Sequence, residues 1–206
     1  MRKPMSVKAL ETFGRVRLSP NFFMRDFLYS EIAVINGFAN VPDDPDLAIE
    51  AGKMLCETLL EPLQARFGRL SIRSAYRSPE VNRFGNINQL NCSTNEKNYA
   101  NHIWDHRDAE GRMGATACVI VNRFIPYYER TGDWEAMAWW VHDHLPYSDM
   151  EFFPRFAAFN LQWREAPVRA IYSYIPPRRG RLTGPDRPNW AGRHDAAYAA
   201  MLEEIG

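Results

Sequence analysis

Two histidines and one cysteine are the residues of this chain whose types and spacing could hold a metal ion. His102 and His106 lie four positions apart, so on a helix both imidazoles would face the same side and could bind one ion. Cys118 would add a thiolate, which is a strong zinc ligand. The segment is not an HExxH motif, because Ile103 follows the first histidine, and nearby glycines leave a loop geometry open. One hypothesis is therefore a zinc site of His102, His106 and Cys118.

The other histidines are poorer candidates for chemistry. His142 and His144 are two positions apart on an expected helix, so their rings should point apart and serve as surface or packing residues. His194 lies in the C-terminal tail, where we expect it to be solvated. The tryptophans at 134, 139 and 140 are expected to be core or interface anchors.

Several elements must position the candidate residues, and the first half of the chain is predicted to be mainly helical. A short helix is expected after Ser19, which would cap it, with Pro20 at its first position. A long helix is expected over 44–67 from the helical spacing of its apolar residues. Alternation predicts a strand over 70–75, followed by the turn Tyr76-Arg77-Ser78-Pro79 and a short helix from Pro79. The asparagine-rich residues 85–101 read as a loop.

Closely spaced strands dominate the second half of the sequence. We expect strands over 116–121, 149–153, 157–163 and 168–174, with a tryptophan-rich helix over 133–144. A basic, proline-rich connector follows from 176 to 188, and a last helix covers 190–204. Helices first and strands late predict an α+β fold, with helices packed on a small antiparallel sheet.

An ordered set of motifs resembles a known family. The stretches "LSPNF", "EPLQARFG", "RSAYRSP" and "EVN" follow one another between Leu18 and Gly85. In this order they resemble the phage and bacterial branch of the zinc D-Ala-D-Ala carboxypeptidase family, which includes VanX-like dipeptidases and endolysins. The resemblance implies a hedgehog/DD-peptidase-like domain over 18–175. It leaves 1–17 as an N-terminal extension and 176–206 as a proline-rich connector with a C-terminal helix.

The same resemblance assigns metal ligands. The family motif S-x-H-x-x-G-x-A-x-D places the first zinc ligand at His102 and the second at Cys118, where the family has aspartate. Residues 103–113 form an insertion between them. The third ligand, a histidine in the family, falls on Asn160 in the segment 159–163. Thiolate makes zinc a weaker Lewis acid and an amide oxygen is a weak ligand, so two of three positions are altered.

Roles in catalysis and substrate binding also follow from the resemblance. Arg77 would stabilise the charged tetrahedral state, and Glu151 would take the proton of the attacking water. Tyr76 and Ser78, in the same turn as Arg77, are the substrate-binding candidates. Structural readings stay open: Arg77 could pair with a carboxylate or cap a turn, and Glu151 could be a solvated or salt-bridged residue.

Two functions follow from these assignments. The first is a peptidoglycan D-Ala-D-Ala metallopeptidase of phage type with an impaired or altered zinc site. The second is a non-catalytic structural or binding protein, such as a phage virion or tail component, that keeps the peptidase fold as a pseudoenzyme. Its partner would be a peptidoglycan peptide or another protein.

The composition and charge of the chain exclude several classes of protein and of partner. Apolar residues make up 46% and charged residues 24% of the 206, which excludes a fully disordered chain. Equal numbers of basic and acidic residues, 25 each, give no electrostatic case for a nucleic-acid partner. No apolar run is long enough to span a membrane, and no apolar segment of a signal peptide follows the basic N-terminus. Three cysteines favour a reducing compartment, so we expect a protein made in the cytoplasm, with the phage virion as a further destination.

Overall fold

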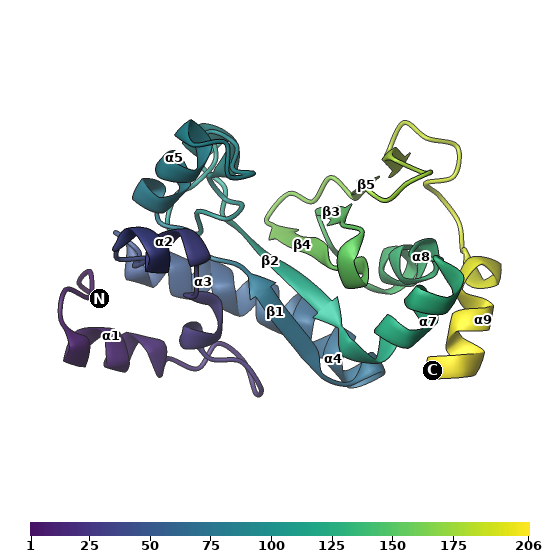
Figure 1. The fold of residues 1–206 in the computed structure, drawn as a ribbon, viewed down its shortest axis with the longest axis horizontal. Coiled ribbons are helices and arrows are strands. Elements are labelled where there is room, and N and C mark those ends of the chain that lie inside the picture. The colour runs from purple at the N-terminus through teal and green to yellow at the C-terminus, as the bar shows by residue number, and fades with distance from the viewer. The chain divides into compact units, whose positions relative to one another are not determined.

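The chain forms two compact units, and each unit is built from two separate segments. The computed structural model describes all residues from 1 to 206. Unit 1 comprises residues 1–57 and 74–117, and unit 2 comprises residues 58–73 and 118–206. Most helices and strands of both units are labelled in Figure 1. The boundaries predicted at residues 18 and 176 depend on the family resemblance and stay predictions.

Unit 1 is mainly helical. Its elements are α1 (Val7–Gly14), the 3-10 helix η1 (Met24–Phe27), α2 (Glu31–Asn36), α3 (Pro45–Leu55), α5 (Pro79–Ile87) and α6 (Asn95–Asn98). Serine hydroxyls cap three of these helices by accepting a backbone N–H of the first turn. Ser6 caps α1, Ser30 caps α2 and Ser78 caps α5. Helices α1 and α2 were not predicted from the sequence, and they are only 8 and 6 residues long.

The prediction of a helix that begins directly after Ser19 is wrong. The backbone N–H groups of Leu18 and Ser19 both point to the Phe22 carbonyl, at 3.0 and 3.3 Å, which closes a tight turn there. The helical turn η1 begins only at Met24. By contrast, the helix expected over 44–67 is present as α3, a π-helical turn (η2, Cys56–Leu60) and α4 (Glu61–Phe67).

The asparagine-rich segment is more ordered than predicted. Helix α5 extends to Ile87, and α6 covers Asn95–Asn98, both within the predicted loop. Asn82 is fully buried, and its amide group donates to the Ser93 carbonyl at 3.0 Å and to Asn95 Oδ1 at 2.9 Å. The Asn98 amide donates to Asn82 Oδ1 at 3.0 Å. Side-chain amides thus replace the hydrogen bonds that a longer helix would provide.

Trp104 forms the centre of the unit 1 core. Its ring lies 5.3 Å from that of Phe27 and 6.2 Å from that of Tyr76, and all three side chains are almost completely buried. Its indole N–H donates to the Thr116 carbonyl at 3.2 Å. Gly52 on α3 makes room for the indole, because a Cβ atom there would lie 3.0 Å from Trp104. The segment 103–113, predicted to be an insertion, therefore begins inside the core.

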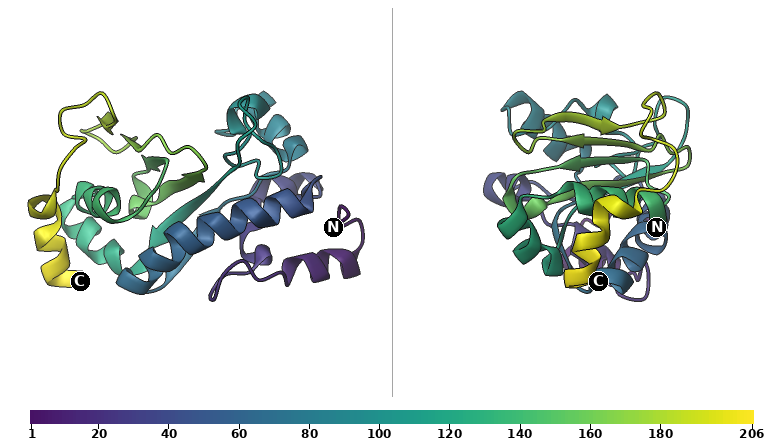
Figure 2. Two further views of the ribbon diagram at one scale, coloured as in Figure 1. Left: turned by 180° about the vertical axis from the view of Figure 1, so that it is seen from behind. Right: turned by 90° about the vertical axis from the view of Figure 1, so that its right-hand side faces the viewer.

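Unit 2 contains most of a six-stranded sheet. Its strands are β1 (Leu70–Ser74), β2 (Gly114–Val121), β3 (Asp149–Phe152), β4 (Phe159–Arg164), β5 (Ala170–Ser173) and β6 (Gly180–Thr183), in the spatial order β1-β2-β4-β3-β5-β6. β3 is antiparallel to β4 and parallel to β5, and β5 is antiparallel to β6. These strands lie side by side in the right-hand view of Figure 2. The predicted α+β class is confirmed.

The prediction that residues 176–188 form only a connector is wrong in part. Residues 180–183 form β6, which pairs with β5 through Tyr172 and Arg181. This strand was not predicted because it is short and is flanked by prolines and arginines, which are typical of loops. Prolines are tolerated next to it because it lies at the edge of the sheet.

Helices of unit 2 pack on one another and on the sheet. They are α4, α7 (Ile125–Thr131), α8 (Glu135–His144) and α9 (Asp195–Ile205), with two 3-10 turns, η3 (Asn122–Phe124) and η4 (Arg155–Ala157). The Trp140 ring on α8 meets Phe67 of α4 edge-on at 4.6 Å, and Trp134 packs on Phe152 of β3 at 5.0 Å. The tryptophans of the predicted helix are thus core residues, as expected.

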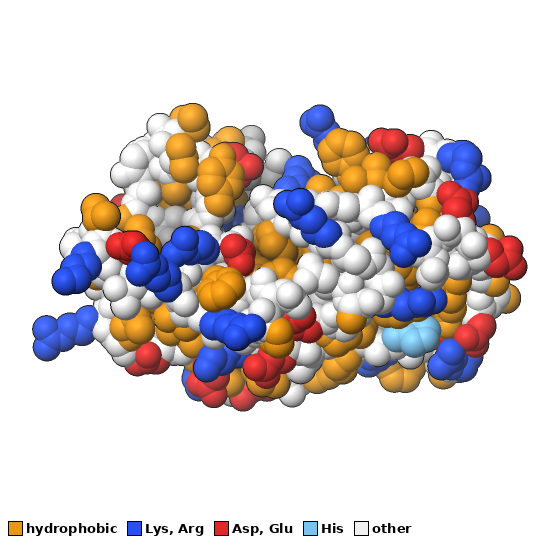
Figure 3. Space-filling model, turned by 90° about the horizontal axis from the view of Figure 1, so that it is seen from below, with side chains coloured by type: hydrophobic (Ala, Val, Ile, Leu, Met, Phe, Trp, Pro, Cys, Tyr) orange, Lys and Arg blue, Asp and Glu red, His pale blue; other side chains and the backbone are white.

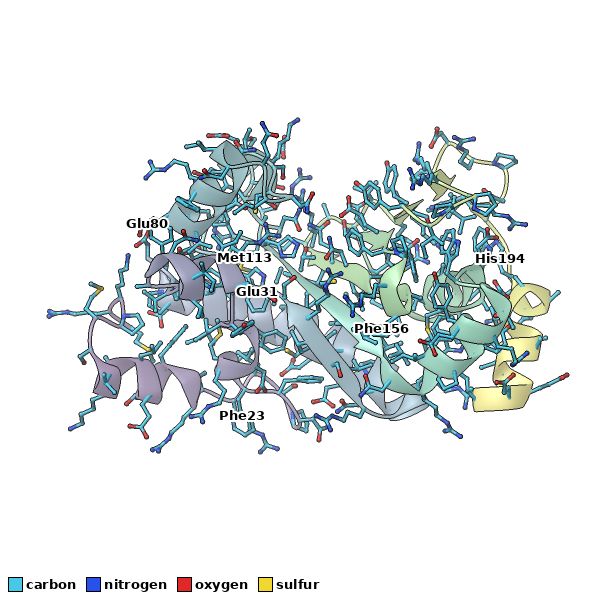
Figure 4. The ribbon with its side chains drawn as sticks, viewed as in Figure 1. Phe23, Glu31, Glu80, Met113, Phe156 and His194 are labelled. Carbon is cyan, nitrogen blue, oxygen red and sulfur yellow. The ribbon has the colours of Figure 1, made fainter.

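His194 is not solvated, in contrast to the prediction. Its ring stacks on Trp139 with centroids 4.0 Å apart, and its Nδ1 lies 2.7 Å from Asp143 Oδ1 of α8. Figure 4 shows this side chain at the beginning of α9. His142 is also a packing residue, between the Tyr147 hydroxyl at 2.7 Å and the Trp190 carbonyl at 2.9 Å.

The surface carries mixed charge. Basic and acidic side chains are both present over the face drawn in Figure 3, and the chain has 25 of each. None of the helices combines the length and the apolar character that crossing a bilayer requires.

Candidate functional site

The predicted Arg-bearing turn follows β1 directly. The Tyr76 N–H donates to the Phe27 carbonyl at 3.1 Å, and the Arg77 N–H donates to the His102 carbonyl at 2.8 Å. Asn40 holds the turn from the other side, since its amide donates to the Tyr76 carbonyl at 2.9 Å and its Oδ1 accepts from the Ser78 N–H at 2.8 Å. The turn therefore fixes Arg77 and His102 next to each other through the backbone.

The two predicted substrate-binding residues of this turn are engaged in the fold. The Ser78 hydroxyl accepts the Val81 N–H at 3.3 Å and so caps α5. The Tyr76 side chain is fully buried against Trp104. Any contact of these two residues with a substrate stays a prediction.

Arg77 has no carboxylate partner. Its Nη1 donates to the Cys92 sulfur at 2.8 Å and to Asn82 Oδ1 at 3.4 Å, and its side chain is half-buried. These partners are a thiol group and a side-chain amide, so no ion pair compensates the guanidinium charge. Such an arginine can bind a carboxylate or an oxyanion of a ligand.

His102 is held as a neutral imidazole of one tautomer. Its Nδ1 lies 2.7 Å from the Ala75 carbonyl oxygen, which only accepts hydrogen bonds, so Nδ1 carries the proton. Burial lowers the pKa of His102 well below its ordinary value, and the nearby positive charge of Arg77 lowers this pKa further. Nε2 consequently has a free lone pair, which is the form in which histidine binds metals.

The expected pairing of His102 with His106 on a helix is wrong. Residues 101–106 form turns, in which the Ala100 N–H donates to the His106 carbonyl at 2.8 Å. The His106 ring instead stacks on Tyr99, with centroids 4.7 Å apart, and its Nδ1 lies 3.5 Å from Asp105 Oδ1. The helical spacing that suggested one shared ion therefore does not apply.

The remaining predicted site residues belong to unit 2. Cys118 is buried on β2 and is not part of a disulfide. Asn160 lies on β4, the strand next to β2 in the sheet. Glu151 lies on β3 directly opposite Asn160, and the Asn160 amide donates to Glu151 Oε2 at 2.9 Å. The sheet register thus brings together the predicted base and the altered third ligand position.

Glu151 influences the pKa values of two neighbouring groups. Its negative charge is the main cause that raises the pKa of the Tyr174 hydroxyl, with burial second. The same charge contributes to the raised pKa of Asp149, where burial is the main cause. One carboxylate oxygen of Glu151 accepts from Asn160, so Glu151 is anchored within the sheet.

The residues present do not fit the complete zinc site that the resemblance implies. The three assigned positions offer one imidazole, one thiol and one amide, and the amide nitrogen is bonded to Glu151. No group of three or more histidine, cysteine, aspartate or glutamate side chains is arranged to hold a metal ion. Only His102 has the chemical form of the expected ligand.

Asp105 is the residue of this region that sequence reasoning missed. It lies in the segment 103–113, yet its side chain is fully buried, and its Oδ2 accepts the Asp43 N–H at 2.7 Å. An aspartate in a polar stretch normally predicts a solvated loop. The only available signal was its position next to His106, since adjacent carboxylate and imidazole groups often act together.

Comparison with known proteins does not place the chain. No protein-family model, no curated protein and no solved structure matches it.

Proposed function

We propose that this chain is a D-Ala-D-Ala peptidase-like protein of phage type, which binds D-Ala-terminated peptides of peptidoglycan but hydrolyses them weakly or not at all. The proposal is supported by the ordered motifs around the Arg77 turn, by the α+β architecture, and by a neutral His102 with a free Nε2. In this proposal the protein keeps the peptide binding of a metallopeptidase but has lost most or all of its catalysis, as a structural or binding component of a virion would.

The hydrogen bond from Asn160 to Glu151 carries this proposal. A metallopeptidase needs a third strong metal ligand and a carboxylate that is free to accept a proton from the attacking water. Here the position assigned to the third ligand is an amide, and this amide occupies an oxygen of the position assigned to the base, at 2.9 Å. This one hydrogen bond therefore weakens both the third metal ligand and the general base that a metallopeptidase needs.

Peptide recognition is assigned to Arg77. Its guanidinium forms no ion pair, so it can pair with the C-terminal carboxylate of a D-Ala-D-Ala peptide. His102 cannot supply this charge, because it is neutral. In this proposal zinc, which would polarise the scissile carbonyl, binds weakly, because the set of donors is incomplete.

Peptide binding tests the proposal. Isothermal titration with a D-Ala-D-Ala-terminated peptide should show saturable binding to the purified chain. Replacing Arg77→Gln should weaken binding by about tenfold or more, because a charge-assisted hydrogen bond contributes about 1.5–3 kcal/mol. Arg83→Gln is the matched control, since Arg83 is exposed on α5 of the same unit.

A peptide without the terminal carboxylate distinguishes specific recognition by Arg77 from non-specific attraction between the peptide and the protein. An amidated peptide without the terminal carboxylate should bind the wild type as weakly as the acid peptide binds Arg77→Gln. Equal affinity of both arginine variants for the acid peptide would contradict the role of Arg77. Absence of any binding would contradict the proposed function.

A further inference from the structure

A cavity of about 800 Å³ lies in the N-terminal part of unit 1. All of its lining residues fall between Pro4 and Val41, and they come from α1, η1, α2 and the segments next to these helices. Most of the lining side chains are apolar. Small-molecule sites in proteins are apolar concavities of about 300–1,000 Å³ with a few polar groups, so this cavity has the size and character of a ligand site.

Several large apolar side chains of the lining are exposed to solvent. Met5, Val7 and Val34 are 75%, 88% and 64% exposed. Exposed apolar side chains that lie singly on a surface are ordinary, whereas a group of them around one concavity marks a binding site. The ligand of this cavity therefore has a hydrocarbon part that covers these side chains.

Most polar side chains of the lining are already bonded within the fold. The Ser6 and Ser30 hydroxyls each accept a helix N–H, at 3.2 and 3.3 Å. The Asn40 amide donates to two backbone carbonyls, both at 2.9 Å. Glu11 is paired with Arg15 at 2.5 Å, so its negative charge is compensated. None of these groups is free to recognise a charged ligand.

Arg25 is the charged side chain of the lining that has no ion pair. Its Nε donates to the Gly14 carbonyl at 3.3 Å, and this is the only hydrogen bond of its guanidinium. Gly14 lets the side chain lie close to α1, because a Cβ atom at this position would be 3.2 Å from Arg25 Cβ. The two Nη groups are therefore available to a ligand, and a carboxylate is the group that a guanidinium binds with two parallel hydrogen bonds.

From the apolar lining and the position of Arg25 we propose that this cavity binds one free long-chain fatty acid. The hydrocarbon chain lies in the cavity, and the carboxylate pairs with the Arg25 guanidinium. A neutral hydrocarbon would leave this charge without a partner, and a cationic amphiphile would be repelled by it. The site does not depend on the proposed function, since it uses none of the residues assigned to peptide recognition or catalysis.

Titration with dodecanoate tests the site. Calorimetry on the full chain, below the concentration at which dodecanoate forms micelles, should show one equivalent bound. Dodecyltrimethylammonium has the same chain length but the opposite charge, and it should bind at least tenfold more weakly. Equal affinity for the two amphiphiles would contradict recognition of a carboxylate.

Two pairs of variants locate the bound molecule. Arg25→Gln should weaken dodecanoate binding by about tenfold or more, because it removes a charge-assisted hydrogen bond. Lys8→Gln removes the same charge from an exposed position on α1 outside the lining, and it should leave the affinity unchanged.

The second pair places a carboxylate inside or next to the cavity. Val34→Glu should weaken binding by tenfold or more, because the new charge lies in the lining. Ile35→Glu is the matched control, since Ile35 is the next residue of α2, is 82% exposed and does not line the cavity. All four substituted side chains are exposed, so the variants should fold, and thermal unfolding checks this.

Three results would overturn the inference. The first is the absence of dodecanoate binding to the wild type. The second is an equal loss of affinity in Val34→Glu and Ile35→Glu, which would mean that dodecanoate adheres to the apolar surface in general. The third is binding to phosphatidylglycerol vesicles, or to an acidic amphipathic helical peptide, without binding of dodecanoate. This last result would assign the apolar surface to a membrane or to a protein partner.

Discussion

His102 shows how one side chain links the fold to its chemistry. Its Nδ1–H is fixed by the Ala75 carbonyl, and burial keeps the ring neutral. An unfolded chain has no such restriction, so its His102 takes up a proton near the ordinary pKa of 6.5. Protonation therefore favours the unfolded state, and the stability of the protein depends on pH in a defined direction.

A variant of His102 should reveal this dependence. The folded pKa is lowered, so the contribution of His102 to stability is present above pH 6.5 and is lost as pH falls below it. The free energy of unfolding of the wild type should fall by up to about 1.4 kcal/mol per pH unit more steeply than that of His102→Asn. Urea unfolding at several values between pH 4.5 and 7 measures both slopes. Equal slopes would show that His102 is accessible to protons in the folded state.

At the scale of elements, Asp143 joins two helices of unit 2. Its side chain on α8 is almost fully buried and accepts three bonds from the start of α9: from the His194 N–H at 2.6 Å, from His194 Nδ1 at 2.7 Å, and from the Tyr198 hydroxyl at 3.1 Å. His194 Nε2 lies 2.9 Å from the Asn189 carbonyl. Both ring nitrogens of His194 therefore face hydrogen-bond acceptors.

Removing this carboxylate should loosen α9. Asp143→Asn leaves the backbone N–H and the ring Nδ1 of His194 without their charged acceptor, whereas the Tyr198 hydroxyl keeps Asp195 Oδ1 at 2.9 Å. We therefore expect the free energy of unfolding to fall by about 2–4 kcal/mol. Glu203→Gln, an exposed change on α9 itself, should change it by less than about 0.5 kcal/mol. Denaturant unfolding gives both values, and hydrogen exchange of the α9 amides locates the change. A fall of similar size in both variants would contradict the role of Asp143.

The sheet elements were predictable from sequence, whereas several helical ones were not. The strands at Leu70–Ser74, Asp149–Phe152 and Phe159–Arg164 follow alternation or short apolar runs bounded by turns, and the last two pair with each other across a short connection. Helices α1 and α2 depend on caps at Ser6 and Ser30, which resemble any polar loop residue. Strand β6 forms only because β5 offers an edge, a fact that no local pattern contains.

On the scale of the whole molecule, the predicted site was partly accessible to sequence reasoning. The turn carrying Arg77 was predicted from the strand before it, whereas the backbone hydrogen bond from Arg77 to His102 was not predicted. The pairing of Asn160 with Glu151 needed the register of two strands, and the burial of Asp105 needed a core built from both segments of unit 1. These features depend on long-range packing, which residue type and spacing do not specify.

Release of D-Ala tests the central claim most directly. Purified wild-type chain, supplied with zinc and a D-Ala-D-Ala-terminated peptide, should release little or no D-Ala. Cys118→Asp with Asn160→His, which restores both assigned ligands and frees Glu151, should raise zinc affinity and D-Ala release together. Rapid release by the wild type, lost on treatment with a chelator, would contradict the claim that the site is altered. A double variant with no gain in zinc binding would contradict the assignment of these positions.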